Sequence, residues 1–180
     1  DAATLRPYWR RWSWSDARLL VAGGLPGVMI GAALYRFADA DLFRLLIGSI
    51  ALIFVMWQIA SRAGAIRAVR KPLPAWVGAL SGLVAGFTSF VSHAGGPAVA
   101  VYLLSKGHSK TRFQATTVLV FGLLNLAKAL PYGFLGIFGR ETLLFGLAMA
   151  PFALTGAWLG VKAHRIVPER AFFAITSVLL

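Results

Sequence analysis

The sequence contains no cysteine and few acidic residues. Of its 180 residues, 6 are Asp or Glu and 3 are His, whereas 18 are Lys or Arg. The absence of cysteine excludes disulfides and thiolate-bound metals, and the scattered histidines and acids offer no clustered metal site. The opening stretch, DAATLRPYWRRW, is polar and aromatic and does not resemble a signal peptide. We therefore expect neither a metal nor another cofactor.

Charged residues as a whole are scarce, at 13% against 58% hydrophobic residues, whereas a soluble domain has about 25% charged residues. Several apolar runs exceed 18 residues, which is enough to cross a bilayer as helices, and they lack the alternation of a membrane barrel. The basic residues gather between these runs, as in cytoplasmic loops. The net charge of +12 therefore does not indicate a nucleic-acid partner. The predicted fold class is an all-α polytopic protein of the cell membrane, with the lipid bilayer as its surroundings.

The apolar runs predict where helices cross the membrane. We expect crossings at Ala17–Phe37, Asp41–Ala60, Gln114–Phe138 and Thr142–Val161, and a fifth helix that starts near Val167. Two rows of glycines at intervals of four residues, one at Gly23, Gly27 and Gly31 and one at Gly78, Gly82 and Gly86, accompany these runs. Such rows let helix backbones approach closely in lipid, so we expect them to hold the helices together.

The first two crossings and the last two are similar at an offset of 129 residues. Leu25, Gly27, Gly31, Arg36 and Phe43 align with Leu154, Gly156, Gly160, Arg165 and Phe172. Internal repeats of this kind are common in secondary transporters. We therefore divide the chain into the remainder of a first repeat, residues 1–73, and a second repeat, residues 74–180. On this interpretation the first repeat lacks its opening hairpin and first helix.

The basic residues also predict the path of Pro74–Ser105, which precedes helices from about 114, 142 and 167. If this segment crosses the membrane once, the basic residues divide 9 inside against 8 outside. If it enters and returns on the same side, they divide 14 against 3. The positive-inside rule favours the second arrangement. The sequence therefore predicts a re-entrant helical hairpin over 74–105 and two repeats of inverted orientation.

The stretch SHAGGPAVAVYLLSK would form the tip and the returning arm of this hairpin. Gly95 and Gly96 permit tight backbone geometry, and Pro97 is a favoured first residue of a helix. The returning helix would begin near the membrane midplane, where its unpaired N–H groups and positive dipole end would attract an anion. His93 has two equal interpretations, as a ligand contact or as a structural residue of the tip.

The next crossing carries polar residues within apolar sequence: Thr116, Thr117, Asn125 and Lys128. A lysine inside a membrane segment costs about 3 kcal/mol on insertion scales, so it indicates a functional site. The alternative for Lys128 is that it snorkels to the outer interface, helped by a kink at Pro131. For the two threonines, hydrogen bonding between helices is an equal alternative.

SHAGGPAVAVYLLSKG followed by RFQATTVLVFGLLNLAKALPYGFLG resembles the second-half signature of the TauE/SafE sulfite exporter family. The resemblance implies a transporter that is built from inverted repeats. It would export small anions such as sulfite or organosulfonates. The residues that match the signature, and that would bind the substrate, are Ser92, His93, Gly95, Gly96, Pro97, Thr116, Thr117, Asn125 and Lys128. The other wall of the site would come from the first hairpin, which this sequence lacks.

Two further functions stay open at this point. An intramembrane hydrolase would use Ser92 and His93, but neighbouring residues on a turn seldom face one another, and neither a G-x-S-x-G motif nor an acidic partner accompanies them. We therefore do not expect an enzyme. The second alternative is an accessory membrane subunit without transport of its own. The sequence does not identify the anion, the direction of transport, the coupling ion (proton or sodium) or the oligomeric state.

Overall fold

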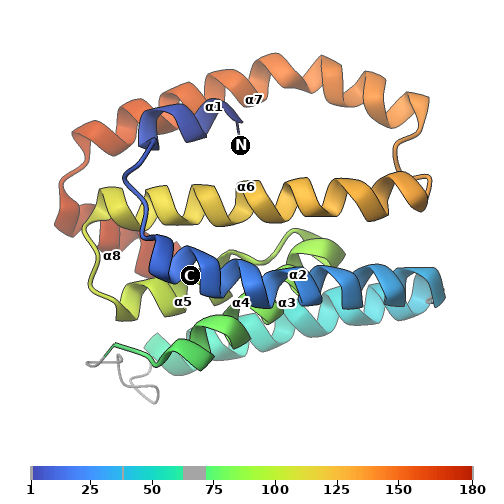
Figure 1. Ribbon diagram of the computed structural model, residues 1–180, viewed down its shortest axis with the longest axis horizontal. Coiled ribbons are helices and arrows are strands. Elements are labelled where there is room, and N and C mark those ends of the chain that lie inside the picture. Colours follow the sequence, from blue (N-terminus) through green and yellow to red (C-terminus); the bar gives the residue numbers. More distant parts are fainter. Residues whose placement is uncertain (1, 38, 63–71, 180) are drawn as a thin grey trace.

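The computed structural model describes residues 2–37, 39–62 and 72–179, and within these it contains helices and no strand. The helices are α1 (Ala2–Leu5), the 3-10 turn η1 (Arg6–Tyr8), α2 (Trp14–Phe37), α3 (Ala40–Arg62), α4 (Ala75–Ser92), α5 (Gly96–Ser105), α6 (Lys110–Phe134), α7 (Arg140–Ile166) and α8 (Glu169–Leu179). Figure 1 shows α6 running between α7 on one side and the group of α2, α4 and α5 on the other. The all-helical fold class is confirmed.

The predicted crossings coincide with α2, α3, α6 and α7, and the fifth apolar segment with α8. Within the described residues, four helices are long and apolar enough to span a bilayer: α2, α4, α6 and α7. In α3 the described apolar stretch is shorter, Arg44–Ile53. The chain is therefore a multi-pass membrane protein. The path of α4 and α5 through the membrane stays a prediction, because α4 alone also has the length of a span.

Among the described helices, α2 and α4 have the most extensive contact. Small residues make it possible: a Cβ added at Gly23 or Gly27 would overlap the backbone of α4, and one added at Gly82 would overlap the backbone of α2. In lipid, such close approach brings van der Waals contacts that hold helices together. The prediction that these glycines serve helix packing is confirmed for both rows.

α4 and α5 form a helical hairpin whose two outer ends meet. The backbone N–H of Leu73, just before α4, donates to Ser105 Oγ at 3.2 Å, and Lys106 Nζ, just after α5, donates to the Leu73 carbonyl at 2.7 Å. The chain therefore leaves the hairpin beside the point where it enters. α5 has ten residues against eighteen in α4, so α4 extends past the start of α5.

The tip of the hairpin differs in detail from the sequence interpretation. The residue in the left-handed conformation is His93, with φ 56°, whereas Gly95 has φ −74°. The tight backbone geometry attributed to the glycine pair thus lies at His93. Gly95 is needed for space and not for its backbone conformation. A Cβ at this position would lie 2.5 Å from the carbonyl oxygen of Ala85. Pro97 lies in the first turn of α5, one residue after the predicted first position, because α5 begins at Gly96.

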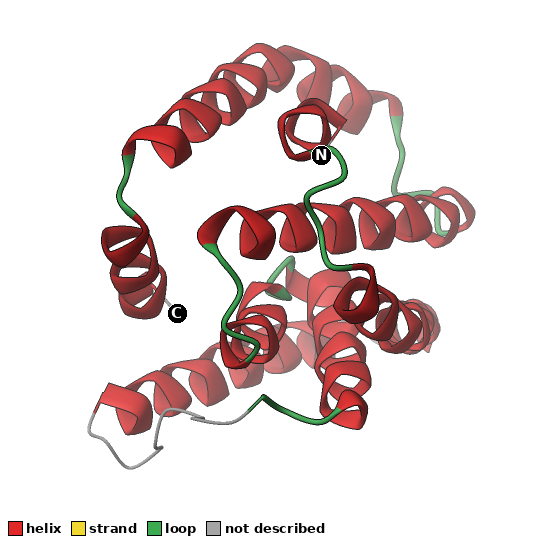
Figure 2. Ribbon diagram, turned by 60° about the vertical axis from the view of Figure 1, so that its left-hand side comes forward, coloured by secondary structure: helices red, strands yellow, loops and turns green. Residues whose placement is uncertain are grey.

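The buried core lies between α2, α4, α5 and α6. Its largest fully buried side chains are Leu20 and Val28 on α2, Val99, Tyr102 and Leu103 on α5, and Thr116, Val120 and Leu124 on α6. α7 has no buried residue among those described. Figure 2 shows α7 and α8 curving around one side of α6. The buried side chains therefore gather among α2, α6 and the hairpin of α4 and α5.

Candidate anion-binding site

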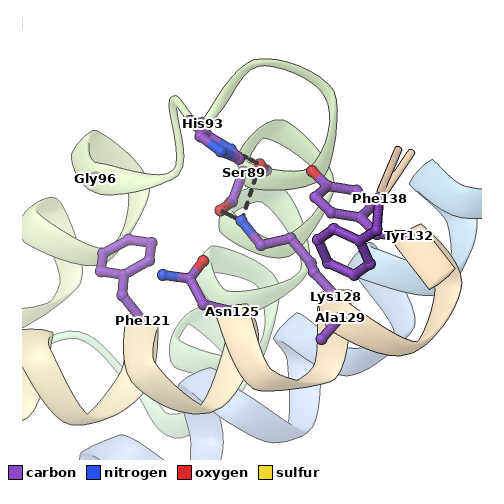
Figure 3. A pocket seen from close by; sticks show the side chains of 9 residues that line it. All are labelled: Ser89, His93, Gly96, Phe121, Asn125, Lys128, Ala129, Tyr132 and Phe138. Carbon is purple, nitrogen blue, oxygen red and sulfur yellow. Dashed lines mark hydrogen bonds between the residues drawn. The ribbon is translucent and has the colours of Figure 1, made fainter. Parts of the chain in front are cut away.

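A cavity of about 500 Å³ lies where the end of α4, the start of α5 and the second half of α6 meet (Figure 3). Its size is within the usual range for small-molecule pockets. The residues that line it are Ser89 on α4, His93 in the turn, Gly96 on α5, Phe121, Asn125, Lys128, Ala129 and Tyr132 on α6, and Phe138 in the loop that follows. The cavity therefore joins the hairpin tip to the helix that carries the intramembrane lysine.

Lys128 is buried, with 3% of its surface exposed. Its Nζ donates to Ser89 at two atoms, the carbonyl oxygen at 3.2 Å and Oγ at 2.9 Å. Ser89 lies in the last turn of α4, at the negative end of the helix dipole. The end of α4 thus stabilises the ammonium inside the protein. This buried, hydrogen-bonded position speaks against the alternative that Lys128 snorkels to the outer interface.

His93 is directed at the same carbonyl. Its backbone N–H donates to the Ser89 carbonyl at 3.2 Å, and its ring Nδ1 lies 2.9 Å from that oxygen. A carbonyl oxygen only accepts, so Nδ1 carries the proton in this arrangement. The remaining ring nitrogen, Nε2, is then an acceptor in the neutral imidazole and a donor in the charged one. The ring borders the cavity on the hairpin side (Figure 3).

The wall of the cavity opposite Lys128 is formed by the N-terminus of α5. The first residue of this helix is Gly96. A Cβ added at Gly96 would meet no atom within 4 Å, so the backbone here is open to a small molecule. The first N–H groups of a helix have no partner within the helix and carry partial positive charge. The positive end of α5 and the negative end of α4 therefore lie at the same cavity.

The rest of the wall comes from one face of α6. Phe121, Asn125, Lys128 and Tyr132 recur at intervals of three or four residues, so they lie along one stripe of the helix. The Tyr132 hydroxyl donates to the carbonyl of Phe90 at 3.1 Å, which ties this stripe to α4. Among the lining residues that the structure describes, Lys128 is the one lysine or arginine.

The structure brings together four of the nine residues predicted to bind a substrate: His93, Gly96, Asn125 and Lys128. The other five, Ser92, Gly95, Pro97, Thr116 and Thr117, do not line this cavity. Ser92 Oγ donates to the carbonyl of Thr88 at 3.2 Å, so it is not paired with His93. Whether the four lining residues contact a substrate stays a prediction.

The two threonines bond to backbone groups away from the cavity. Thr116 Oγ1 donates to the carbonyl of Arg112 at 2.7 Å and accepts the N–H of Ser13 at 3.0 Å, so it joins α6 to the start of α2. Thr117 Oγ1 donates to the carbonyl of Phe113 at 3.0 Å. These bonds agree with the alternative of a structural role, which the sequence left open.

The sequence did not indicate Ser89, Phe121, Ala129, Tyr132 or Phe138. For Phe121 and Tyr132, their spacing from Lys128 on α6 would have sufficed to place them on its face. Ser89 has no such signal, because it lies on a different helix. In the described part of the chain, no three His, Asp or Glu side chains gather as a metal site would require.

The comparisons with known proteins agree with this picture. The family model described as sulfite exporter TauE/SafE matches residues 1–180. No curated protein and no solved structure gives a significant match. Because the family match spans the whole chain, and the structure supplies the membrane-length helices that such a transporter needs, the chain belongs to the TauE/SafE sulfite exporter family of membrane transporters.

Proposed function

We propose that this protein transports a small sulfur-containing anion, sulfite or an organosulfonate, through the cavity between the hairpin tip and α6. The observation that carries the proposal is the buried ammonium of Lys128 at a cavity that also holds the open N-terminus of α5. The family's name indicates sulfite and export. In this proposal the hairpin of α4 and α5 is re-entrant, so that its tip lies near the membrane midplane.

Three groups would share the negative charge of the anion. Lys128 has three N–H donors, and Ser89 accepts from it at two atoms, which leaves a donor for the ligand. The first turn of α5 supplies partial positive charge equivalent to about half a proton. His93 would add a donor at Nε2 when its imidazole is charged. Half-helices that direct their N-termini at an anionic substrate are a recurring design in secondary transporters.

Lys128 has a structural explanation as well, because it caps the end of α4. The two roles predict different outcomes for Lys128→Met. Methionine has a similar length and removes the cost of burying an ammonium group, so we expect the variant to fold and insert. If the lysine binds the anion, the variant loses transport and loses stabilisation by sulfite or sulfonates. If it only caps α4, the variant loses stability but keeps its response to the anion.

The test measures efflux or uptake of radiolabelled sulfite in vesicles that contain the full-length protein, with thermal stabilisation by sulfite, sulfate, sulfoacetate and taurine in parallel. Lys128→Arg keeps the charge with altered geometry, so we expect part of the binding to remain. Lys162→Met is the matched control, since Lys162 lies on α7 over the ring of Trp158 and outside the cavity. Transport by Lys128→Met equal to that of Lys162→Met would overturn the proposed site.

A further inference from the structure

Two further cavities lie at the other end of α6, beside η1, the start of α6 and the end of α7. Lys110 and Lys128 are 18 positions apart on α6, which corresponds to about 27 Å along the helix axis. This region is therefore separate from the cavity proposed for transport. Its two cavities have volumes of about 350 and 400 Å³.

The smaller cavity is basic. Arg11, Lys110 and Arg165 line it, together with the hydroxyl group of Thr111. No acidic residue is among the described residues that line it. Three cationic side chains in one cavity repel one another unless an anion lies between them. The Lys110 ammonium is held in place, because Nζ donates to the carbonyls of His164 at 2.8 Å and Val167 at 2.5 Å.

The larger cavity is mostly apolar. Ala157 and Gly160 of α7 and Phe172 and Ile175 of α8 line it, and the uncharged polar residues Thr4, Gln114 and Thr176 contribute as well. A Cβ added at Gly160 would meet no atom within 4 Å, so the glycine leaves room along the helix. No Lys, Arg, Asp or Glu is among the described residues that line this cavity, so its chemistry suits a hydrocarbon chain better than an ion.

The two cavities adjoin, because Tyr8, Val161 and His164 line both of them. Two polar groups therefore lie at the junction. Burial raises the pKa of Tyr8, and the nearby charge of Arg165 opposes this rise, so the phenol stays protonated and can donate a hydrogen bond. His164 Nδ1 is buried and has no hydrogen-bond partner in the part of the chain that the structure describes.

The level of the site in the membrane is marked by tryptophans. The rings of Trp9 and Trp12 are 5.4 Å apart and those of Trp12 and Trp14 are 5.7 Å apart, both pairs edge to face. Trp9 and Trp14 are largely exposed. Indole rings are enriched at the headgroup level of a bilayer, and these three residues follow η1 directly along the chain. The basic cavity beside η1 is therefore expected at the depth of lipid phosphates.

We propose that an anionic phospholipid binds here, with its phosphate in the basic cavity of Arg11, Lys110 and Arg165 and an acyl chain in the apolar cavity between α7 and α8. Basic pockets between membrane helices at the headgroup level are a known mode of recognition for such lipids. A free anion would occupy only the basic cavity, whereas a phospholipid accounts for both cavities and for their junction. The bound lipid would connect α7 and α8 to the start of α6.

The test uses the full-length protein, purified in detergent and stripped of lipid. Native mass spectrometry and thermal unfolding are measured with phosphatidylglycerol, with zwitterionic phosphatidylcholine of the same chains, and with soluble glycerol phosphate. We expect phosphatidylglycerol to bind and to raise the unfolding temperature, and the other two to have little effect. Equal effects of the two lipids would overturn the proposal, and so would an equal effect of glycerol phosphate, which would indicate a small-anion site.

Variants separate the two cavities. Arg11→Gln combined with Arg165→Gln should weaken phosphatidylglycerol binding by roughly tenfold or more. Arg44→Gln is the matched control, because Arg44 is exposed on α3 and pairs with Asp41. Gly160→Leu should fill the apolar cavity and weaken lipid binding while leaving the basic cavity intact. If lipid binding is the same in these variants as in the Arg44→Gln control, the assignment of this site is wrong.

Discussion

Replacing Gly27 by alanine tests the packing that positions the candidate site. Gly27 lies in the middle of α2, and an added Cβ would overlap the carbonyl oxygen of Leu83 and lie 2.8 Å from the backbone nitrogen of Phe87. Both neighbours are backbone atoms of α4, which cannot rotate away as a side chain can. The two helices must therefore separate to accommodate one methyl group.

The expected change in stability is the difference between two terms. Glycine to alanine in a helix favours the helix by about 1 kcal/mol, and overpacking of this kind costs about 1–3 kcal/mol. Gly48→Ala on α3 is the matched control, because no described atom lies within 4 Å of its added Cβ. We expect the control to gain stability and Gly27→Ala to be about 1–3 kcal/mol less stable than the control.

The assay is thermal unfolding of both variants in the same detergent, together with stabilisation by sulfite. Separation of α2 from α4 also moves Ser89, which accepts the hydrogen bonds of Lys128. Gly27→Ala should therefore lose part of the response to sulfite, whereas Gly48→Ala should keep it. If the two variants unfold at the same temperature, the close approach of α2 and α4 is not as described, and the argument from glycine packing fails.

Three further predictions follow from particular contacts. Asp16→Ala removes the hydrogen-bond partner of the side chains of Ser13, Tyr102 and His108. It should lower the unfolding free energy by about 1–3 kcal/mol for each buried group left unpaired, measured by thermal unfolding. Gly95→Ala should destabilise the hairpin because of its contact with α4, whereas Gly96→Val should fold normally and weaken sulfite binding, since only Gly96 lines the cavity. Cysteines introduced at Ala68, outside the described residues, and at Gly107 should label from the same side of intact cells if 74–105 is re-entrant; labelling from opposite sides would refute that path.

The helices were predictable because apolar runs of membrane length leave few alternatives. α2 and α7 extend a few residues beyond the predicted segments at one or both ends. The largest difference at the start of a helix is at α6, which begins at Lys110 and not at Gln114. There Ser109 caps the helix by accepting the N–H of Arg112, so polar residues form the first turn. Hydropathy alone does not detect such a turn, whereas the serine cap does.

The candidate site was predictable in part. The sequence identified Lys128 and Asn125 because polar residues are rare within a membrane segment. It identified His93 and Gly96 because they interrupt an apolar run. It did not identify Ser89, which is an ordinary small residue of an apolar helix. Its importance depends on the distance of 2.9 Å between its Oγ and Lys128 Nζ, and such a contact between α4 and α6 exists only after the chain has folded.

The three helices around the cavity share one support, which is α2. α4 is held to it by the glycine rows, and α5 by the hydrogen bond of Tyr102 to Asp16 at 3.2 Å. α6 is held to it by the bond between Thr116 and Ser13 and by Leu124, which contacts the position of Gly24. α2 itself contributes no residue to the cavity.

This arrangement divides the residues that the sequence analysis selected into those that position the cavity walls and those that line the cavity. The glycine rows and Thr116 act through α2 and fix the positions of the walls, whereas His93, Gly96, Asn125 and Lys128 lie on the walls. A substitution in the first group alters stability and site geometry together, because the walls move with their support. A substitution in the second group is expected to alter anion binding with less effect on folding. Comparing the two effects for each variant therefore distinguishes a residue that positions the site from one that contacts the anion.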